Sequence, residues 1–131
     1  MKQAVVGIVE HQGKVLIGRK KKQNNHSMSE QWHVPGGKVL PSERPDEALR
    51  REIREEANIE ISNERLLEQS QQQDTVVYWF CCTAKTTHIK AGSDLSDVRF
   101  VKREEVKNWC SQEALSRWPK SVQEYFEAKQ T

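Results

Sequence analysis

The chain has 131 residues, of which 31% are charged, and its formal net charge at pH 7 is +2. This length predicts a single domain, residues 1–131, that can bury a hydrophobic core. The nearly balanced charge argues against a stable nucleic-acid partner and against a membrane-surface protein. No segment has the length of a membrane span, and no secretion signal is present. Three cysteines without metal-site spacing indicate free thiols, so we expect a cytoplasmic protein.

Strands and helices are predicted in alternation, without repeats or linkers. β-Branched and alternating residues predict strands over 2–10, 15–19, 32–34, about 60–70, 75–83 and 97–101. The first two strands form a hairpin, because His11-Gln12-Gly13-Lys14 is typical of a turn. Residues 20–30 are polar and predict a surface loop. Helical patterns cover about 45–57 and 112–128, the second interrupted at Pro119. This order predicts an α/β fold, in which helices pack on a mixed sheet as an α/β/α sandwich.

The helix predicted over 45–57 carries the most informative side chains. Pro45 suits its first turn, where a missing N–H costs nothing. At about 100° per residue, Glu52, Glu55 and Glu56 fall within an arc of about 100° on one face. Carboxylates that close repel one another unless a cation neutralises them. An oxygen-rich cluster without thiolate or imidazole suits Mg²⁺ or Mn²⁺ rather than zinc.

A plainer interpretation of this segment is a solvated helix face. Runs such as Arg50-Arg51-Glu52 are common on exposed helices, where i,i+4 pairs add a little stability. The spacing favours the metal site, because it specifies seven positions together. These are Gly37, Glu43, Arg51, Glu52, an apolar residue at 53, Glu55 and Glu56.

The run GKVLPSERPDEALRREIREEANI, residues 37–59, resembles the signature of the Nudix hydrolases. The family pattern is Gly, five residues, Glu, seven residues, then Arg-Glu-apolar-x-Glu-Glu-x-Gly-apolar. Every position matches except the last glycine, where this chain has Asn58. That position predicts a left-handed residue just after a helix, which Asn tolerates best after Gly. We therefore expect the change to leave activity intact. The lead-in WHVPGG, residues 32–37, extends the resemblance.

The resemblance implies the same α/β/α sandwich and a set of ligands for Mg²⁺, with Mn²⁺ as a substitute. Glu52, Glu55 and Glu56 would bind the metal together with the Gly36 carbonyl. Glycines at 36 and 37 let the backbone approach metal or phosphate without a Cβ in the way. Arg51 and Glu43 are predicted to pair and to lock the loop to the helix, a supporting role that the resemblance also implies.

The general base stays open between two places. Glu52 or Glu55 could serve within the motif, and the resemblance also implies an acidic residue in a later loop, where Asp94 and Asp97 lie. Turn and cap chemistry would explain those aspartates equally well. For substrate phosphate, the candidates are Arg19 at the end of the second strand, Lys38 and the Gly37 backbone.

The implied activity is metal-dependent hydrolysis of a nucleoside diphosphate linked to another group, with a small nucleotide as the substrate. The first hypothesis is that a nucleoside triphosphate, canonical or oxidised, is cleaved to the monophosphate and pyrophosphate. ADP-ribose or a nucleotide sugar is the second, weakened because no proline lies about fifteen residues past the motif. A nucleotide-sensing domain without catalysis is the third, and the full set of acidic residues argues against it. A monomer and a homodimer are equally compatible with the sequence.

Overall fold

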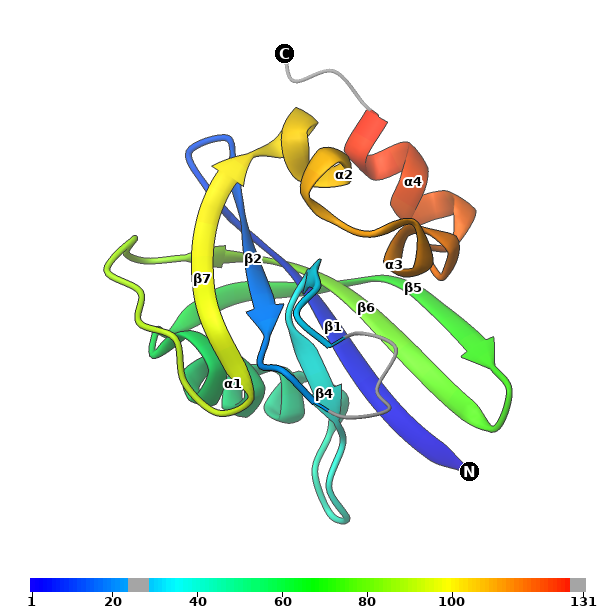
Figure 1. Cartoon of the computed structure of the whole chain (residues 1–131). Helices are drawn as coiled ribbons and strands as arrows, with labels where there is room; N and C mark the ends of the chain where they lie inside the picture. Colours follow the sequence, from blue (N-terminus) through cyan, green and yellow to red (C-terminus); the bar gives the residue numbers. More distant parts are fainter. Residues whose placement is uncertain (24–28, 128–131) are drawn as a thin grey trace.

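The computed structural model describes residues 1–23 and 29–127 (Figure 1). These residues form seven strands: β1 (Lys2–His11), β2 (Lys14–Lys20), β3 (Trp32–His33), β4 (Gly36–Lys38), β5 (Ile61–Gln72), β6 (Thr75–Ala84) and β7 (Leu95–Lys102). The helices are α1 (Pro45–Ala57), the 3₁₀ turn η1 (Arg103–Glu105), α2 (Val106–Trp109), α3 (Gln112–Ser116) and α4 (Lys120–Glu127). Part of the loop predicted over 20–30 lies outside the described residues.

The strands form one mixed sheet in which β1 is central. Its main path runs β3-β2-β1-β6-β5, while β4 pairs with β1 and β7 pairs with β2. The pairing of β1 with β6 is parallel, and the other named pairs are antiparallel. The predicted hairpin of β1 and β2 is confirmed by the partners Glu10↔Val15 and His11↔Lys14.

Helices cover both faces of the sheet, so the predicted α/β/α sandwich is confirmed. Figure 1 shows α1 on one face and α2, α3 and α4 on the other. Alternation along β6 divides its side chains between two cores: Phe80 and Cys82 pack with α1, and Trp79 and Cys81 pack with the C-terminal helices. All three cysteines are free and buried. No helix in the described ranges is long and apolar enough to cross a membrane.

Helix α1 has the predicted bounds. Asp46 and Glu47 lie in its first turn, where they favour the helix dipole. Leu49 and Ile53, one turn apart, are fully buried against the sheet. The helix ends at Asn58, which adopts the left-handed conformation with φ 60° and ψ 35° and donates its backbone N–H to the Arg54 carbonyl. Because these apolar residues face the sheet, Glu52 and Glu56 lie on the part of α1 that contacts β4.

Two parts of the fold differ from the prediction. No strand was predicted over residues 36–38, but they form β4, paired with β1 through Val6↔Gly36. A Cβ at Gly36 would collide with the backbone of Val5, so glycine is required because the two chains approach so closely. The short helical segments over 103–109 were also not predicted, since each is too short for a periodic pattern.

Candidate active site

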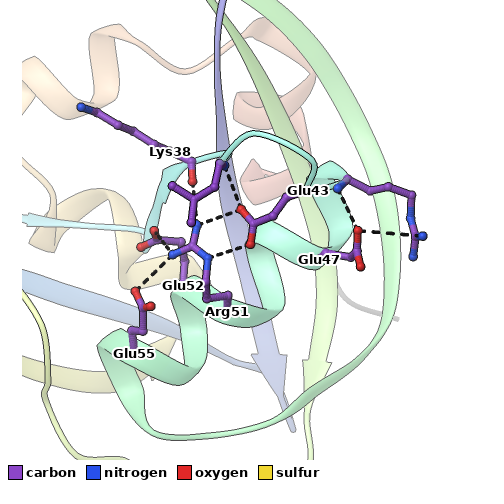
Figure 2. Close-up of polar contacts among 8 residues, drawn as sticks. Lys38, Glu43, Glu47, Arg51, Glu52 and Glu55 are labelled. Atoms are coloured by element: carbon purple, nitrogen blue, oxygen red, sulfur yellow. Dashed lines mark hydrogen bonds and ion pairs between the residues drawn. The ribbon is translucent and has the colours of Figure 1, made fainter.

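Arg51 is the centre of the polar network on α1 (Figure 2). Its guanidinium donates to both carboxylate oxygens of Glu43, at 2.8 and 3.1 Å, and to the Lys38 carbonyl at 2.9 Å. One of its nitrogens also donates to Glu52 at 2.8 Å and to Glu55 at 3.2 Å. The predicted pair of Arg51 and Glu43 is therefore present. The pair ties the loop before α1 to the helix, and Arg51 also holds the carboxylates of Glu52 and Glu55.

This network perturbs the titration of its members. The hydrogen bonds from Arg51 and from the Leu40 backbone N–H lower the pKa of Glu43, so its carboxylate stays charged. The pKa of Arg51 is raised, chiefly by its hydrogen bond to Glu43. A bidentate arginine–carboxylate pair fixes both side chains in one geometry, so the pair acts as a rigid link between loop and helix.

Glu56 is the only buried charged residue in the described chain, with 1% of its surface exposed. One carboxyl oxygen accepts the Gly36 N–H at 3.1 Å, while the other is buried without a hydrogen-bond partner. Burial, followed by the charge of Glu52, raises the pKa of Glu56 to about 9. Without a cation, Glu56 therefore carries a proton at neutral pH.

Glu52 lies directly over Gly37. A Cβ on Gly37 would overlap the Glu52 carboxyl group, so the missing side chain makes room for that carboxylate. Burial raises the pKa of Glu52, although the Arg51 hydrogen bond opposes the shift and the charges of Glu55 and Asp94 add to it. The three glutamates predicted to share one face of α1 differ in solvent exposure: Glu56 is buried, Glu52 is half-buried and Glu55 is exposed.

Of the two loop aspartates, only Asp94 reaches this site. Its carboxylate pairs with the Lys20 ammonium at 2.5 Å and lies beside Glu56, whose pKa it raises. Although burial opposes it, the hydrogen bond from Lys20 lowers the pKa of Asp94. Asp97 lies in β7 opposite Arg19, and its carboxylate contacts Arg99 and the Val98 N–H instead.

The side chains predicted to bind substrate phosphate, those of Arg19 and Lys38, do not join the carboxylate network. Arg19 is exposed and donates to the Glu30 carbonyl, on the opposite side of β2 from Lys20. Lys20, which was not among the candidates predicted from the sequence, is the β2 cation that enters the site and pairs with Asp94. Alternation along the strand separates the two, and only the packing of the sheet decides which one faces the site. Lys38 is exposed, and Figure 2 shows its side chain extending away from the Arg51 network.

A cavity of about 450 Å³ adjoins these residues, between the sheet and the C-terminal helices. Lys20, Gly36, Gly37 and Lys38 line one end. Val77, Trp79 and Trp118 give it apolar surface. Gln72 and Arg117 also line it and are joined by a 2.9 Å hydrogen bond from the Gln72 amide to the Arg117 carbonyl. The volume falls within the range of about 300–1,000 Å³ that is usual for small-molecule sites.

His33 also lines this cavity, and sequence reasoning assigned it no role. Burial lowers the pKa of His33, and its Nδ1 lies 2.5 Å from the Val34 carbonyl. Because a carbonyl only accepts, Nδ1 carries the proton and the buried Nε2 is an acceptor without a partner. The side chain therefore adds a neutral polar group to the charged end of the cavity.

The carboxylates suit a divalent cation. Within the described ranges, no three Asp, Glu, His or Cys side chains are already gathered as a metal-binding group, since Arg51 draws Glu52 and Glu55 toward itself. One buried oxygen of Glu56 nevertheless lies next to the acids Glu52 and Asp94, where a bound cation would neutralise the ionised carboxylates. Oxygen donors of this kind fit Mg²⁺ or Mn²⁺.

Comparisons with known proteins agree with this geometry. The family model of the NUDIX domain matches residues 1–122, and the chain therefore belongs to the Nudix family and is a hydrolase. It is 27% identical to the CTP pyrophosphohydrolase of Escherichia coli (strain K12), over 91% of this chain and 82% of that protein. It is 32% identical to the nucleoside triphosphatase NudI of Klebsiella pneumoniae (strain 342), over 60% of this chain and 67% of that protein.

Solved structures show the same fold. A NUDIX hydrolase from Nitrosomonas europaea superimposes with a TM-score of 0.79 at 21% identity, over 96% of this chain and 70% of that one. A MutT structure, from a study of Aliivibrio salmonicida and Vibrio cholerae, gives a TM-score of 0.74 at 19% identity, over 96% of this chain and 97% of that one.

Adjacent glycines give a test of the site geometry. In Gly37→Ala the new methyl group displaces the Glu52 carboxylate, so hydrolysis should fall at least about tenfold while the fold remains. In Gly36→Ala the methyl group meets the Val5 backbone, so the free energy of unfolding should fall by about 1–3 kcal/mol. Urea unfolding and hydrolysis rates measure both. A Gly37→Ala variant with wild-type rates would show that Glu52 does not need its position over Gly37.

The buried carboxyl group predicts how stability depends on pH. The folded-state pKa of Glu56 is about 9 against an ordinary 4.5, so above pH 4.5 the folded state keeps a proton that the unfolded state releases. Stability of the metal-free protein should therefore fall between pH 7 and 8.5, at about 1 kcal/mol per pH unit from this group. Glu56→Gln should remove that slope, and the control Glu55→Gln, at an exposed residue, should keep it. Urea unfolding in EDTA measures the slopes. Parallel slopes for wild type and Glu56→Gln would contradict the assignment.

Proposed function

We propose that this protein is a Mg²⁺-dependent pyrophosphohydrolase that cleaves a nucleoside triphosphate to the monophosphate and pyrophosphate. The observation that carries the proposal is Glu56, a buried carboxyl group that is hydrogen-bonded to Gly36, a residue that lines a nucleotide-sized cavity. A buried carboxyl group destabilises the fold when it ionises unless a cation neutralises it, so buried carboxyl groups of this kind are common at functional sites. The metal ion bound with the phosphates of a nucleotide would supply that cation.

The residues that would hold the metal are Glu52, Glu55, Glu56 and the Gly36 carbonyl. When bound, a divalent cation neutralises phosphate charge and lowers the pKa of a coordinated water. The chain itself contributes the rigid frame. Glu56 is fixed by the Gly36 N–H at 3.1 Å, and Glu52 by Arg51 at 2.8 Å, so their positions do not depend on the arrival of substrate.

Glu52 is the best candidate for the general base among the predicted acids. A base works best when its pKa approaches the working pH, and burial raises the pKa of Glu52. The pKa of Asp94 is lowered and its carboxylate is paired with Lys20, which makes it a weaker base. Glu55 is exposed and hydrogen-bonded to Arg51. Asp94 instead holds the Lys20 ammonium beside Glu56, where it meets substrate phosphate.

The rest of the cavity accommodates the nucleoside. Trp79 and Trp118 offer apolar and aromatic surface for a base, while Gln72 and Arg117 supply polar groups at its edge. Lys38 is exposed and also lines the cavity, so its ammonium is available for substrate phosphate. Similarity to a CTP pyrophosphohydrolase and to a nucleoside triphosphatase supports a triphosphate substrate.

The direct test is a panel of canonical and 8-oxo nucleoside triphosphates, ADP-ribose and nucleotide sugars, each with Mg²⁺, Mn²⁺ or EDTA. We expect metal-dependent release of pyrophosphate from triphosphates. Glu56→Gln should lower turnover at least about a thousandfold, because it removes a charge that the metal needs, while the variant stays folded by circular dichroism.

Other results would change the assignment in defined ways. Turnover of ADP-ribose or nucleotide sugars alone would move the substrate to that class. Tight nucleotide binding with no turnover would favour a sensor. A folded Glu56→Gln variant with near wild-type turnover would refute the carboxylate–metal site itself.

A further inference from the structure

We propose that Asn58, the one departure from the Nudix pattern, is a positioning residue that clamps the loop carrying Asp94 onto the catalytic helix. The inference rests on the proposed function, because Asp94 acts within the site described there. A glycine at residue 58 would satisfy the backbone conformation, with φ 60°. The asparagine satisfies it too and adds a side-chain donor, which glycine lacks.

The loop over residues 85–94 is fastened to the end of α1 by three hydrogen bonds. The Lys90 N–H donates to the Ala57 carbonyl at 3.1 Å, and the Gly92 N–H donates to the Glu56 carbonyl at 3.0 Å. The Asn58 amide donates to the Lys90 carbonyl at 2.7 Å. Both backbone groups of Lys90 are therefore hydrogen-bonded at the end of α1, the N–H to Ala57 and the C=O to Asn58.

This attachment leads directly to the site. One residue separates Lys90 from Gly92, and one more separates Gly92 from Asp94, which pairs with Lys20 beside Glu56. Gly92 packs so closely that a Cβ would meet the Glu55 carbonyl, and that Cβ would lie 3.3 Å from the Asn58 amide nitrogen. The Asp94 carbonyl also accepts the Lys21 N–H at 2.8 Å. Asp94 is therefore held from both sides, by the end of α1 and by the end of β2.

The closing experiment is a double-mutant cycle of Asn58→Gly and Asp94→Asn. Asn58→Gly restores the family residue yet should lower kcat about threefold to tenfold, the range for one lost hydrogen bond. In the Asp94→Asn background the same change should have almost no further effect, because the group that it positions is gone. KM should change less than kcat, since the cavity walls are untouched.

A matched control is present in the same chain. Asn63 is also exposed and left-handed, with φ 57°, and its amide donates to Thr83 at 3.2 Å, away from the site. Asn63→Gly should leave kcat unchanged. Asn58→Asp keeps the shape but faces the Lys90 carbonyl with an acceptor, so it should lower kcat at least as much as Asn58→Gly.

Amide hydrogen exchange gives a readout that needs no turnover. Asn58→Gly should speed exchange at Lys90 and Gly92 in the folded protein, while Asn63→Gly should not. Equal losses of kcat with and without Asp94, or unchanged exchange at both amides, would overturn the clamp. If the wild type hydrolyses no nucleotide, the proposed function fails separately and the exchange result alone decides whether Asn58 holds the loop.

Discussion

The burial of the Glu56 carboxyl group is the constraint on which the site depends. Removing an ionised carboxylate from water costs several kcal/mol unless a partner compensates it, and the one backbone donor to Glu56 in the described chain is the Gly36 N–H. The neighbouring acids Glu52 and Asp94 make ionisation harder still. The apolar packing of Leu49 and Ile53 against the sheet keeps α1 in place despite this cost. The metal-free protein therefore keeps Glu56 protonated, and a bound divalent cation would replace that proton.

The site also depends on close packing of the β4 backbone, which two glycines allow. Gly36 allows β4 to pair tightly with β1, which brings its N–H to Glu56, and Gly37 leaves the space that Glu52 fills. Arg51 then joins the loop, the helix and the backbone of β4 in one network. Each contact comes from a different element, so the sheet and the helix together define the carboxylate positions.

Local features were predictable from the sequence, and features set by the packing of the sheet were not. The bounds of α1, the common face of its glutamates and the Arg51–Glu43 pair follow from spacing along a single helix and its preceding loop. The choice between Arg19 and Lys20 depends on which face of β2 meets the site. The choice between Asp94 and Asp97 depends on where β7 begins. β4 was not predicted because glycine has a low strand propensity. The burial of Glu56 was not predictable either, because it depends on how α1 and β4 pack against each other.

The central claim is that Glu56 is protonated without metal and gives up its proton when a cation binds. Proton release upon Mg²⁺ binding tests this most directly, by titration calorimetry at pH 7.5 in buffers of different ionisation enthalpy. The account predicts release of about one proton per metal-binding event in the wild type, and clearly less in Glu56→Gln if that variant still binds. Binding of Mg²⁺ to the wild type without proton release would contradict the account.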